Sequence, residues 1–295
     1  MSARDWSLLV LLSIIWGGSF LFARIAVLEI PPLTLVFFRV FLAAIALNIY
    51  IVARRVPATT SRSIWWSFAM MGILNNIIPF SLIFYGQQEI GAGLAAIINA
   101  MTPIWTIMIA HQFTSDEKMT RVKVVGVLLG FAGVAVLIGP NIFSGLSNAG
   151  LAQIAVLGAT ISYALSGVFG RRFANINPVI TARGQLTTSS LLMLPVAAYA
   201  DQFWTLSLPS QSALWSVIAL AIICTAFAYV LFFSILASAG AVNNALVTFL
   251  VPVSAVMMGI AVLGETLTQQ HIIGTGLILI ALLVIDGRLF SWSGK

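Results

Sequence analysis

The residues of this sequence that could do chemistry are polar side chains set deep in apolar stretches. Asn75 and Asn76 stand in the middle of the apolar segment 64–87, and Asn99 is the eighth residue of the segment 92–112. At 1.5 Å per residue, Asn99 would lie about 12 Å into a helix. Amides at such depth need a partner or water. Asn76 and Asn99 are therefore predicted to line a cavity, where they could bind ammonium and carboxylate groups. The alternative is hydrogen bonding between helices, worth about 0.6–2 kcal/mol per bond.

Aromatic side chains could form the walls of the same cavity. Ligand sites are mostly apolar with a few polar groups, and a buried Tyr hydroxyl needs a partner that a dry core seldom supplies. Core packing is the alternative role. The deep aromatic residues predicted to line the site are Trp16, Tyr85, Trp105 and Tyr163.

Two charges lie inside apolar segments, Arg39 and Arg183. Each is expected to extend its guanidinium to the membrane interface, the alternative being to attract a substrate carboxylate or to pair with a helix end. No carboxylate stands near a segment centre, where a proton-coupled pump usually has one. The segments therefore offer no central group to carry a proton, although Glu89, Asp286 or a histidine could still exchange one.

Composition sets the environment of the chain. Charged residues make up 7% and hydrophobic residues 60% of it, whereas soluble domains carry roughly 25% charged residues. The chain is therefore predicted to be an integral membrane protein, and its net charge of +6 is attributed to cytoplasmic loops rather than to nucleic-acid binding. With Cys224 as its one cysteine and two histidines at segment ends, no enzyme, metal site or cofactor is predicted.

Apolar segments predict an all-α protein with ten transmembrane helices, because a spanning segment must satisfy its own backbone hydrogen bonds. The predicted segments are 5–25, 33–53, 64–87, 92–112, 121–139, 150–170, 178–200, 212–236, 242–263 and 271–289. Ten spans place eleven of the fourteen Lys and Arg residues on one side, with Arg24 opposite and Arg39 and Arg183 inside. Basic residues favour the cytoplasm, so both termini are predicted to be cytoplasmic.

The chain carries an internal repeat. Residues of matching type recur 147 to 149 positions apart: Pro31 and Pro178, Thr34 and Thr181, Pro103 and Pro252, Glu117 and Glu265, Gly126 and Gly274. Two units follow, residues 1–140 and 141–295. Five helices in each half would insert the second half upside down, which is typical of transporters whose substrate site lies between inverted repeats.

Prolines inside the segments bend the helix axis, because each removes one helical hydrogen bond. The repeat-related prolines Pro103 and Pro252 are predicted to act as hinges. A static kink that serves packing is the alternative.

Four motifs carry a resemblance to a known family: WGGSFLFAR in the first segment, PPLTLVFFR in the second, the Pro103-to-Glu117 spacing, and the glycines at 126, 130 and 133. The chain resembles the EamA type of the drug/metabolite transporter superfamily over both halves, and within it the YddG-type amino-acid exporters of bacterial inner membranes. The resemblance implies a central cavity with the fifth and tenth helices packed outside it.

The function expected from repeat and resemblance together is a monomeric inner-membrane carrier that exports aromatic or small neutral amino acids by alternating access. Its partners would be a small-molecule substrate and the lipid bilayer. Two alternatives stay open: export of other metabolites or drugs by the same fold, and proton-coupled antiport. The second half departs from the first, with Tyr163 where the first half has Trp16.

Overall fold

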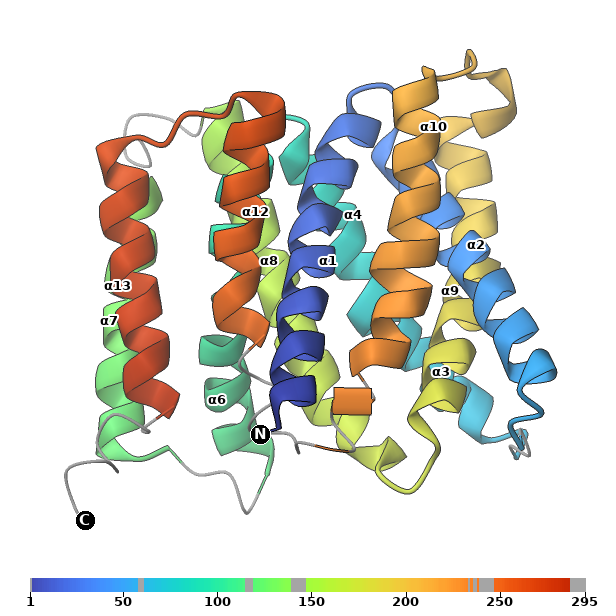
Figure 1. Ribbon diagram of the computed structural model, residues 1–295, viewed down its shortest axis with the longest axis horizontal. Coiled ribbons are helices and arrows are strands. Elements are labelled where there is room, and N and C mark those ends of the chain that lie inside the picture. The colour runs from blue at the N-terminus through green and yellow to red at the C-terminus, as the bar shows by residue number, and fades with distance from the viewer. Residues whose placement is uncertain are drawn as a thin grey trace.

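The structure, a computed structural model, describes residues 2–57, 61–114, 119–138, 147–232, 234–235, 238 and 247–286, and all regular secondary structure in these ranges is helical (Figure 1). Glu117, Arg288 and Lys295, on which the repeat and the charge distribution partly rest, lie outside the described residues, as does the side chain of Asp286. Six helical segments are long and apolar enough to span a membrane: Ala3–Val27, Pro32–Ala53, Ile64–Gln87, Ala92–Phe113, Asn148–Phe173 and Gln211–Phe232.

Helices occupy the described part of every predicted segment, with interruptions in three of them. The elements of the first half are α1 (Ala3–Val27), α2 (Pro32–Ala53), α3 (Ile64–Gly72), the π-helix η1 (Ile73–Ile77), α4 (Ile78–Gln87), α5 (Ala92–Asn99), α6 (Thr102–Phe113) and α7 (Arg121–Ile138). Those of the second half are α8 (Asn148–Gly170), the 3₁₀ turns η3 (Arg171–Phe173) and η4 (Phe203–Thr205), α9 (Pro178–Asp201), α10 (Gln211–Ile218), the π-helix η5 (Ala219–Phe227), α12 (Val247–Leu263) and α13 (Gln269–Asp286).

Local chemistry fixes where several helices begin. Ser2 and Asp5 form a reciprocal capping box at the start of α1, which satisfies two otherwise free N–H groups. Proline occupies the first position of α2 and α9, where its missing N–H costs no hydrogen bond. The carboxylate of Asp201, at the end of α9, accepts hydrogen bonds from both the N–H and the hydroxyl of Thr34 at 2.8 Å. The start of α2 is thereby tied to the second half of the chain.

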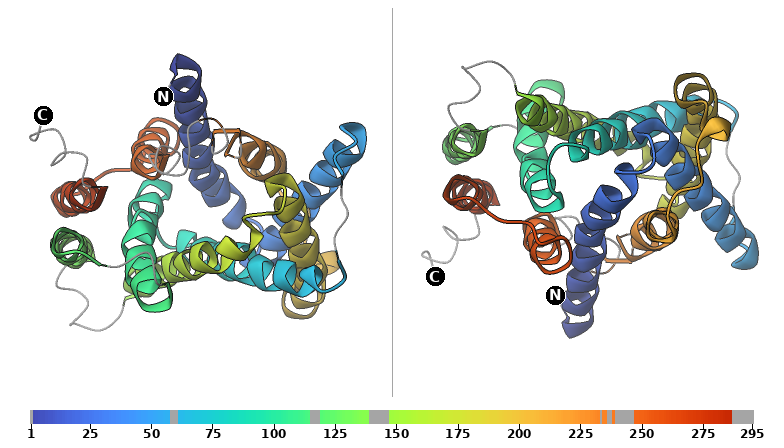
Figure 2. Two further views of the ribbon diagram at one scale, coloured as in Figure 1. Left: turned by 90° about the horizontal axis from the view of Figure 1, so that it is seen from below. Right: turned by 90° about the horizontal axis from the view of Figure 1, so that it is seen from above.

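The helices stand roughly side by side and form a ring when viewed along their axes (Figures 1 and 2). The paired helices α7 and α13 pack against each other at the edge of the molecule. Gly133 and Gly274 allow this approach, because a Cβ at either position would lie 2.8–2.9 Å from the carbonyl oxygen of the other. Close approach of helix backbones through small residues is common in membranes.

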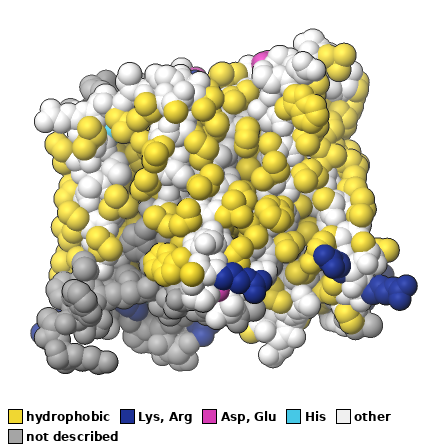
Figure 3. Space-filling view, viewed as in Figure 1, with side chains coloured by type: hydrophobic (Ala, Val, Ile, Leu, Met, Phe, Trp, Pro, Cys, Tyr) yellow, Lys and Arg dark blue, Asp and Glu magenta, His cyan; other side chains and the backbone are white. Residues whose placement is uncertain are grey.

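The outer surface suits a lipid environment. Hydrophobic side chains cover most of the visible face, while Lys and Arg gather along the end that carries the N-terminus (Figure 3). Large apolar side chains such as Leu191 and Met257 are 65–66% exposed. The hydrocarbon core of a bilayer requires an apolar surface between polar ends, and this surface therefore fits a membrane protein.

Candidate functional site

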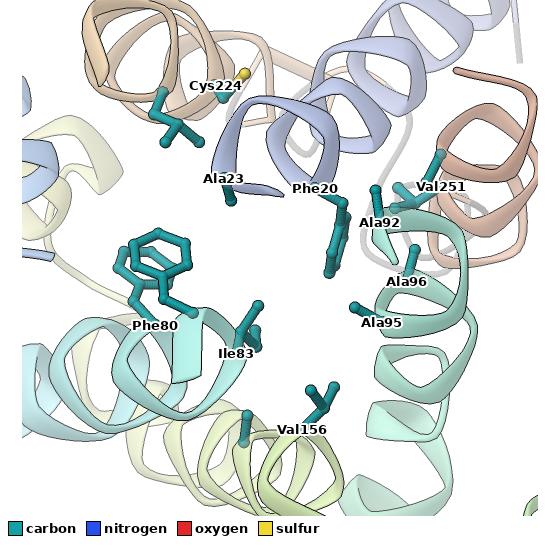
Figure 4. Close-up of a cluster of buried hydrophobic side chains, with 14 of the residues drawn as sticks. Phe20, Ala23, Phe80, Ile83, Ala92, Ala95, Ala96, Val156, Cys224 and Val251 are labelled. Atoms are coloured by element: carbon teal, nitrogen blue, oxygen red, sulfur yellow. The ribbon is translucent and has the colours of Figure 1, made fainter. Parts of the chain in front are cut away.

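A cavity of about 610 Å³ lies among the helices, within the range of small-molecule sites. Its walls come from α1 to α6 with the π-helix η1, from α8 and α9, from η5 and the helical turn that follows it, and from α12. None of its described lining residues belongs to α7 or α13. Figure 4 shows Phe20 of α1, Phe80 and Ile83 of α4, and Val251 of α12, which form part of its apolar wall.

The cavity extends to the end of the bundle that carries the connection between α8 and α9. Phe173, Ala174, Ile176 and Pro178 of this connection are among the lining residues. At the other end, α1 and α4 are joined by polar contacts: Gln87 Nε2 donates to the carbonyl of Phe20 at 2.8 Å and the Arg24 guanidinium donates to the carbonyl of Gln88 at 2.8 Å. The two ends of the cavity are thus built differently.

Three of the predicted site residues line the cavity: Trp16, Asn99 and Tyr163. Trp16 packs against Phe232, with 5.7 Å between ring centroids. Asn99 ends α5 at a break in the helix, and its side-chain oxygen is buried with no hydrogen-bond partner among the described residues. A buried acceptor in this state needs a donor from elsewhere.

The other three predicted residues lie elsewhere, which corrects their expected placement. Asn76 is fully buried behind the wall, where its Nδ2 donates to Ser189 Oγ at 3.0 Å. Trp105 packs edge-on against Phe131 of α7, with centroids 5.1 Å apart. Tyr85 is 61% exposed on the outer side of α4. Neighbouring residues of a helix differ by about 100° in direction, so depth alone did not fix which of them faces inward.

The two hinge candidates occupy different local structures. Pro103 is the second residue of α6, directly after the break at Ala100 and Met101. Pro252 lies inside the continuous helix α12 and lines the cavity.

Arg39 corrects a second expectation, because its guanidinium does not extend to an interface. The residue is 7% exposed and lines the cavity. Its Nε donates to Thr225 Oγ1 at 3.0 Å, and its guanidinium carbon lies 3.8 Å from the centroid of the Phe80 ring. Arg183, in contrast, lies on α9 outside the lining and donates from Nε to Asn48 at 2.7 Å.

Both π-helices present polar side chains to the cavity. In η5, Thr225 donates to the carbonyl of Leu220, five residues earlier, and accepts from Arg39. In η1, Asn75 donates to Gln185 and to the hydroxyl of Tyr229, each at 3.2 Å, and accepts from Ser166 at 3.1 Å. π-Helical turns occur often at functional sites. Here η1 is joined through Asn75 to α8, α9 and the helical turn that follows η5, whereas η5 contacts α2 through Thr225 and Arg39.

Sequence reasoning did not place Gln185 or Thr225 at the cavity, which both residues line. The adjacent amides Asn75 and Asn76 were a visible signal, and the structure places Asn75 in the cavity lining rather than Asn76, which the sequence analysis had selected. No sequence feature marked η5, whose stretch ALAIICTAF reads as an ordinary apolar segment.

A helical membrane protein with a central cavity of mixed polarity has the architecture of a small-molecule transporter. The model of the EamA-like transporter family matches residues 6–139 and again residues 150–286. The chain therefore belongs to the EamA-like transporter family, as the motifs in its sequence had indicated.

Relatives along the whole chain carry transporter names. The uncharacterized transporter YoaV of Bacillus subtilis is 24% identical, with 92% of each chain covered. The uncharacterized inner membrane transporter YedA of Escherichia coli is 25% identical over 96% of this chain and 91% of YedA. A probable amino-acid metabolite efflux pump of Salmonella typhimurium is 25% identical over 96% of this chain and 95% of the pump. One crystal structure shares the fold, with a TM-score of 0.68 at 17% identity over 99% of this chain and all of the other.

Proposed function

We propose that this protein is an inner-membrane carrier that moves amino acids or closely related metabolites out of the cytoplasm by alternating access. The observation that carries the proposal is the cavity itself, which combines an aromatic and aliphatic wall with amides, hydroxyls and one guanidinium. Polar groups of this kind suit the backbone of an amino acid, and the apolar wall suits its side chain. The name of the Salmonella relative points to the same substrate class.

The carrier would consist of ten spans arranged as two inverted repeats, residues 1–140 and 141–295. Two observations support this arrangement. The family model matches the chain twice, and the π-helices occupy related positions, since adding 147 to the numbers of Ile73–Ile77 gives 220–224, inside Ala219–Phe227. Two copies of one unit in opposite orientations would give two related conformations, one open to each side.

The end that carries the N-terminus would face the cytoplasm. Arg171 and Arg172 lie in the connection to which the cavity extends, and basic residues favour that side. A cavity accessible from there would load substrate for export. Cysteine labelling in a Cys224→Ala background tests the orientation: Ser61→Cys should react only from the cytoplasm and Ser207→Cys only from outside. Reaction of both from one side would exclude it.

Movement down a gradient is proposed in preference to proton antiport. The described residues that line the cavity include no Asp or Glu, so the described wall offers no carboxylate to carry a proton with the substrate. A carrier of other metabolites or of drugs with the same fold is the second candidate, because the aromatic wall would also accept them.

Counterflow in proteoliposomes tests the proposal. Purified protein is reconstituted with unlabelled phenylalanine, methionine or threonine inside, and uptake of the labelled compound is measured with and without a pH gradient. Accumulation without a pH gradient supports facilitated transport, and stimulation by the gradient beyond the effect of pH alone would favour proton coupling. Transport of lipophilic drugs with no flux of any amino acid would overturn the substrate class.

Variants locate the site. Asn99→Ala and Tyr163→Ala should each change rate or selectivity, because both residues line the cavity. Tyr85→Ala is the matched control, since Tyr85 has the same side chain at an exposed position outside the cavity. If both lining variants transport substrate at the wild-type rate and with the wild-type selectivity, the substrate site lies elsewhere.

A further inference from the structure

The position of Arg39 bears on which charge the ligand of the cavity carries. Arg39 is the one charged residue among the described residues that line the cavity. It stands on α2 and is 7% exposed. A guanidinium this deep would be costly without a counter-ion, because removing a charge from water is compensated only by good pairing.

The protein supplies no such counter-ion in its described part. The carboxylate of Asp201 binds Thr34 and that of Glu265 binds Ala92 and Gly93. Asp5 is bound by Ser2 and Ser238. Glu29 is bound by Ser210 and Glu89 is exposed. None of these carboxylates lines the cavity, and each of the four that are hydrogen-bonded already has its own donors.

Contacts with the protein hold the guanidinium in one orientation. One face lies on the Phe80 ring at 3.8 Å and the Nε edge is bound to Thr225 at 3.0 Å. Among the described residues, no hydrogen bond uses the two terminal nitrogens, Nη1 and Nη2. These nitrogens form the fork that fits a carboxylate through two parallel hydrogen bonds.

We propose that Arg39 is the carboxylate-recognition residue of the cavity, and that the preferred ligand is a monocarboxylate with an apolar or aromatic body and no positive charge. This rests on the proposed function in placing the ligand in the central cavity. A zwitterion would meet Arg39 through its carboxylate, but the described lining residues offer its ammonium only neutral acceptors, such as Asn99. A phosphate ester, with its larger charge, would call for additional cations.

Four compounds with one ring and different charges test this on purified wild-type protein by titration calorimetry: 3-phenylpropanoate, phenylalanine, 3-phenylpropanamide and phenethylamine. The expected order of affinity is the carboxylate, then the zwitterion, then the amide and the amine. The carboxylate should bind about tenfold or more tightly than the amide, as a charge-assisted hydrogen bond implies. Equal affinity for carboxylate and amide, preference for the amine or the zwitterion, or no binding of any of the four would overturn the proposal.

Substitutions of Arg39 test whether this residue causes the preference for the carboxylate. In Arg39→Gln the affinity for 3-phenylpropanoate should fall to that for 3-phenylpropanamide, and binding of the amide reports that the variant is folded. Arg39→Lys should keep part of the preference, because it retains the charge but not the fork. Arg183→Gln is the matched control, since it makes the same change at an arginine outside the cavity. An undiminished preference in Arg39→Gln would refute the assignment. If Arg39→Gln does not fold, the order of the four compounds in wild type decides.

Failure of this inference is distinct from failure of the proposed function. Amino-acid counterflow that continues at the wild-type rate in Arg39→Gln would leave the carrier in place and remove the role of Arg39. Arg39-dependent binding of 3-phenylpropanoate without flux of any amino acid or carboxylate would keep the binding site and remove the carrier.

Discussion

The carboxylate of Glu265 accepts a hydrogen bond from the backbone N–H of Gly93, with 2.9 Å between Oε2 and the nitrogen. Its other oxygen accepts a hydrogen bond from Ala92 at 2.5 Å, so a residue beyond α12 caps the N-terminus of α5. Gly264 sets the direction of the chain into Glu265, because it takes a φ of +65°. The backbone N–H of Glu265 then donates to the carbonyl of Gly259 at 3.1 Å. This is a glycine-terminated helix end, which a residue with a Cβ adopts only at a cost.

Removal of this cap should destabilise the protein. Glu265→Ala is expected to cost about 1–2 kcal/mol, because two N–H groups at a helix N-terminus lose a charged acceptor. Glu265→Gln should cost less, since one amide oxygen remains. Thermal unfolding in detergent measures the effect, with Glu89→Ala as the control at an exposed glutamate. Equal midpoints for Glu265→Ala and Glu89→Ala would show that the cap contributes nothing.

Removal of a buried serine hydroxyl should change the stability of the protein differently at Ser189 and at Ser81. Ser189 accepts from Asn76 at 3.0 Å and is fully buried. Ser189→Ala should therefore cost about 1–3 kcal/mol, because the Asn76 amide loses its acceptor. Ser81 Oγ is buried without a hydrogen-bond partner in the described structure, so Ser81→Ala should be neutral or stabilising. Chemical or thermal unfolding of the two variants makes the comparison, and a larger loss for Ser81→Ala would contradict it.

Two glycines of α13 should also differ. A Cβ at Gly274 would meet the carbonyl oxygen of Gly133 at 2.8 Å, whereas one at Gly276 meets nothing within 4 Å. Gly274→Ala should cost about 1–3 kcal/mol by separating α7 from α13, and Gly276→Ala should stabilise the helix by up to about 1 kcal/mol. The thermal unfolding midpoints of the two variants test this difference in stability. Similar midpoints would mean that the two helices move apart without cost.

Replacement of the prolines tests whether they act as hinges. Pro103→Ala and Pro252→Ala should each slow counterflow several-fold, because the bend would serve the change between conformations. Pro103→Ala should also change substrate affinity little, since Pro103 does not line the cavity. Pro195→Ala, inside α9 and outside the cavity lining, is the control. Exchange at the wild-type rate in both variants would leave Pro103 and Pro252 as static kinks.

Acid should weaken the hydrogen bonds between Glu29, which follows α1, and Ser210, which precedes α10. Hydrogen bonds from the side chain and backbone of Ser210 lower the pKa of Glu29 below its ordinary value of 4.5. A lowered folded-state pKa stabilises the protein above the unfolded pKa, and this stabilisation is lost as pH falls through the folded value. As the pH is lowered below about 4.5, the thermal unfolding midpoint of the wild-type protein should therefore fall more steeply than that of Glu29→Gln. The effect should be small because Glu29 is exposed, and parallel curves would refute it.

The sequence by itself determined that the chain is a helical membrane protein of the EamA-like family. Low charge and long apolar segments leave little alternative to helices in lipid, and the motifs pointed to the family. It also identified Trp16, Asn99 and Tyr163, which the structure places in the cavity wall. Each of these residues was recognisable by its depth in a segment, a property that can be counted along the chain.

Only the tertiary structure decided which face of each helix looks inward. A soluble helix reveals its buried face through a polar stripe on the other side, but a membrane helix is apolar toward both the lipid and the protein core. The sequence therefore could not tell that Tyr85 faces outward, that Asn75 faces the cavity in place of Asn76, or that Arg39 lies over Phe80. These orientations are set by contacts between helices far apart in the chain, and the π-helical turns that present Asn75 and Thr225 leave no periodic mark in an apolar segment.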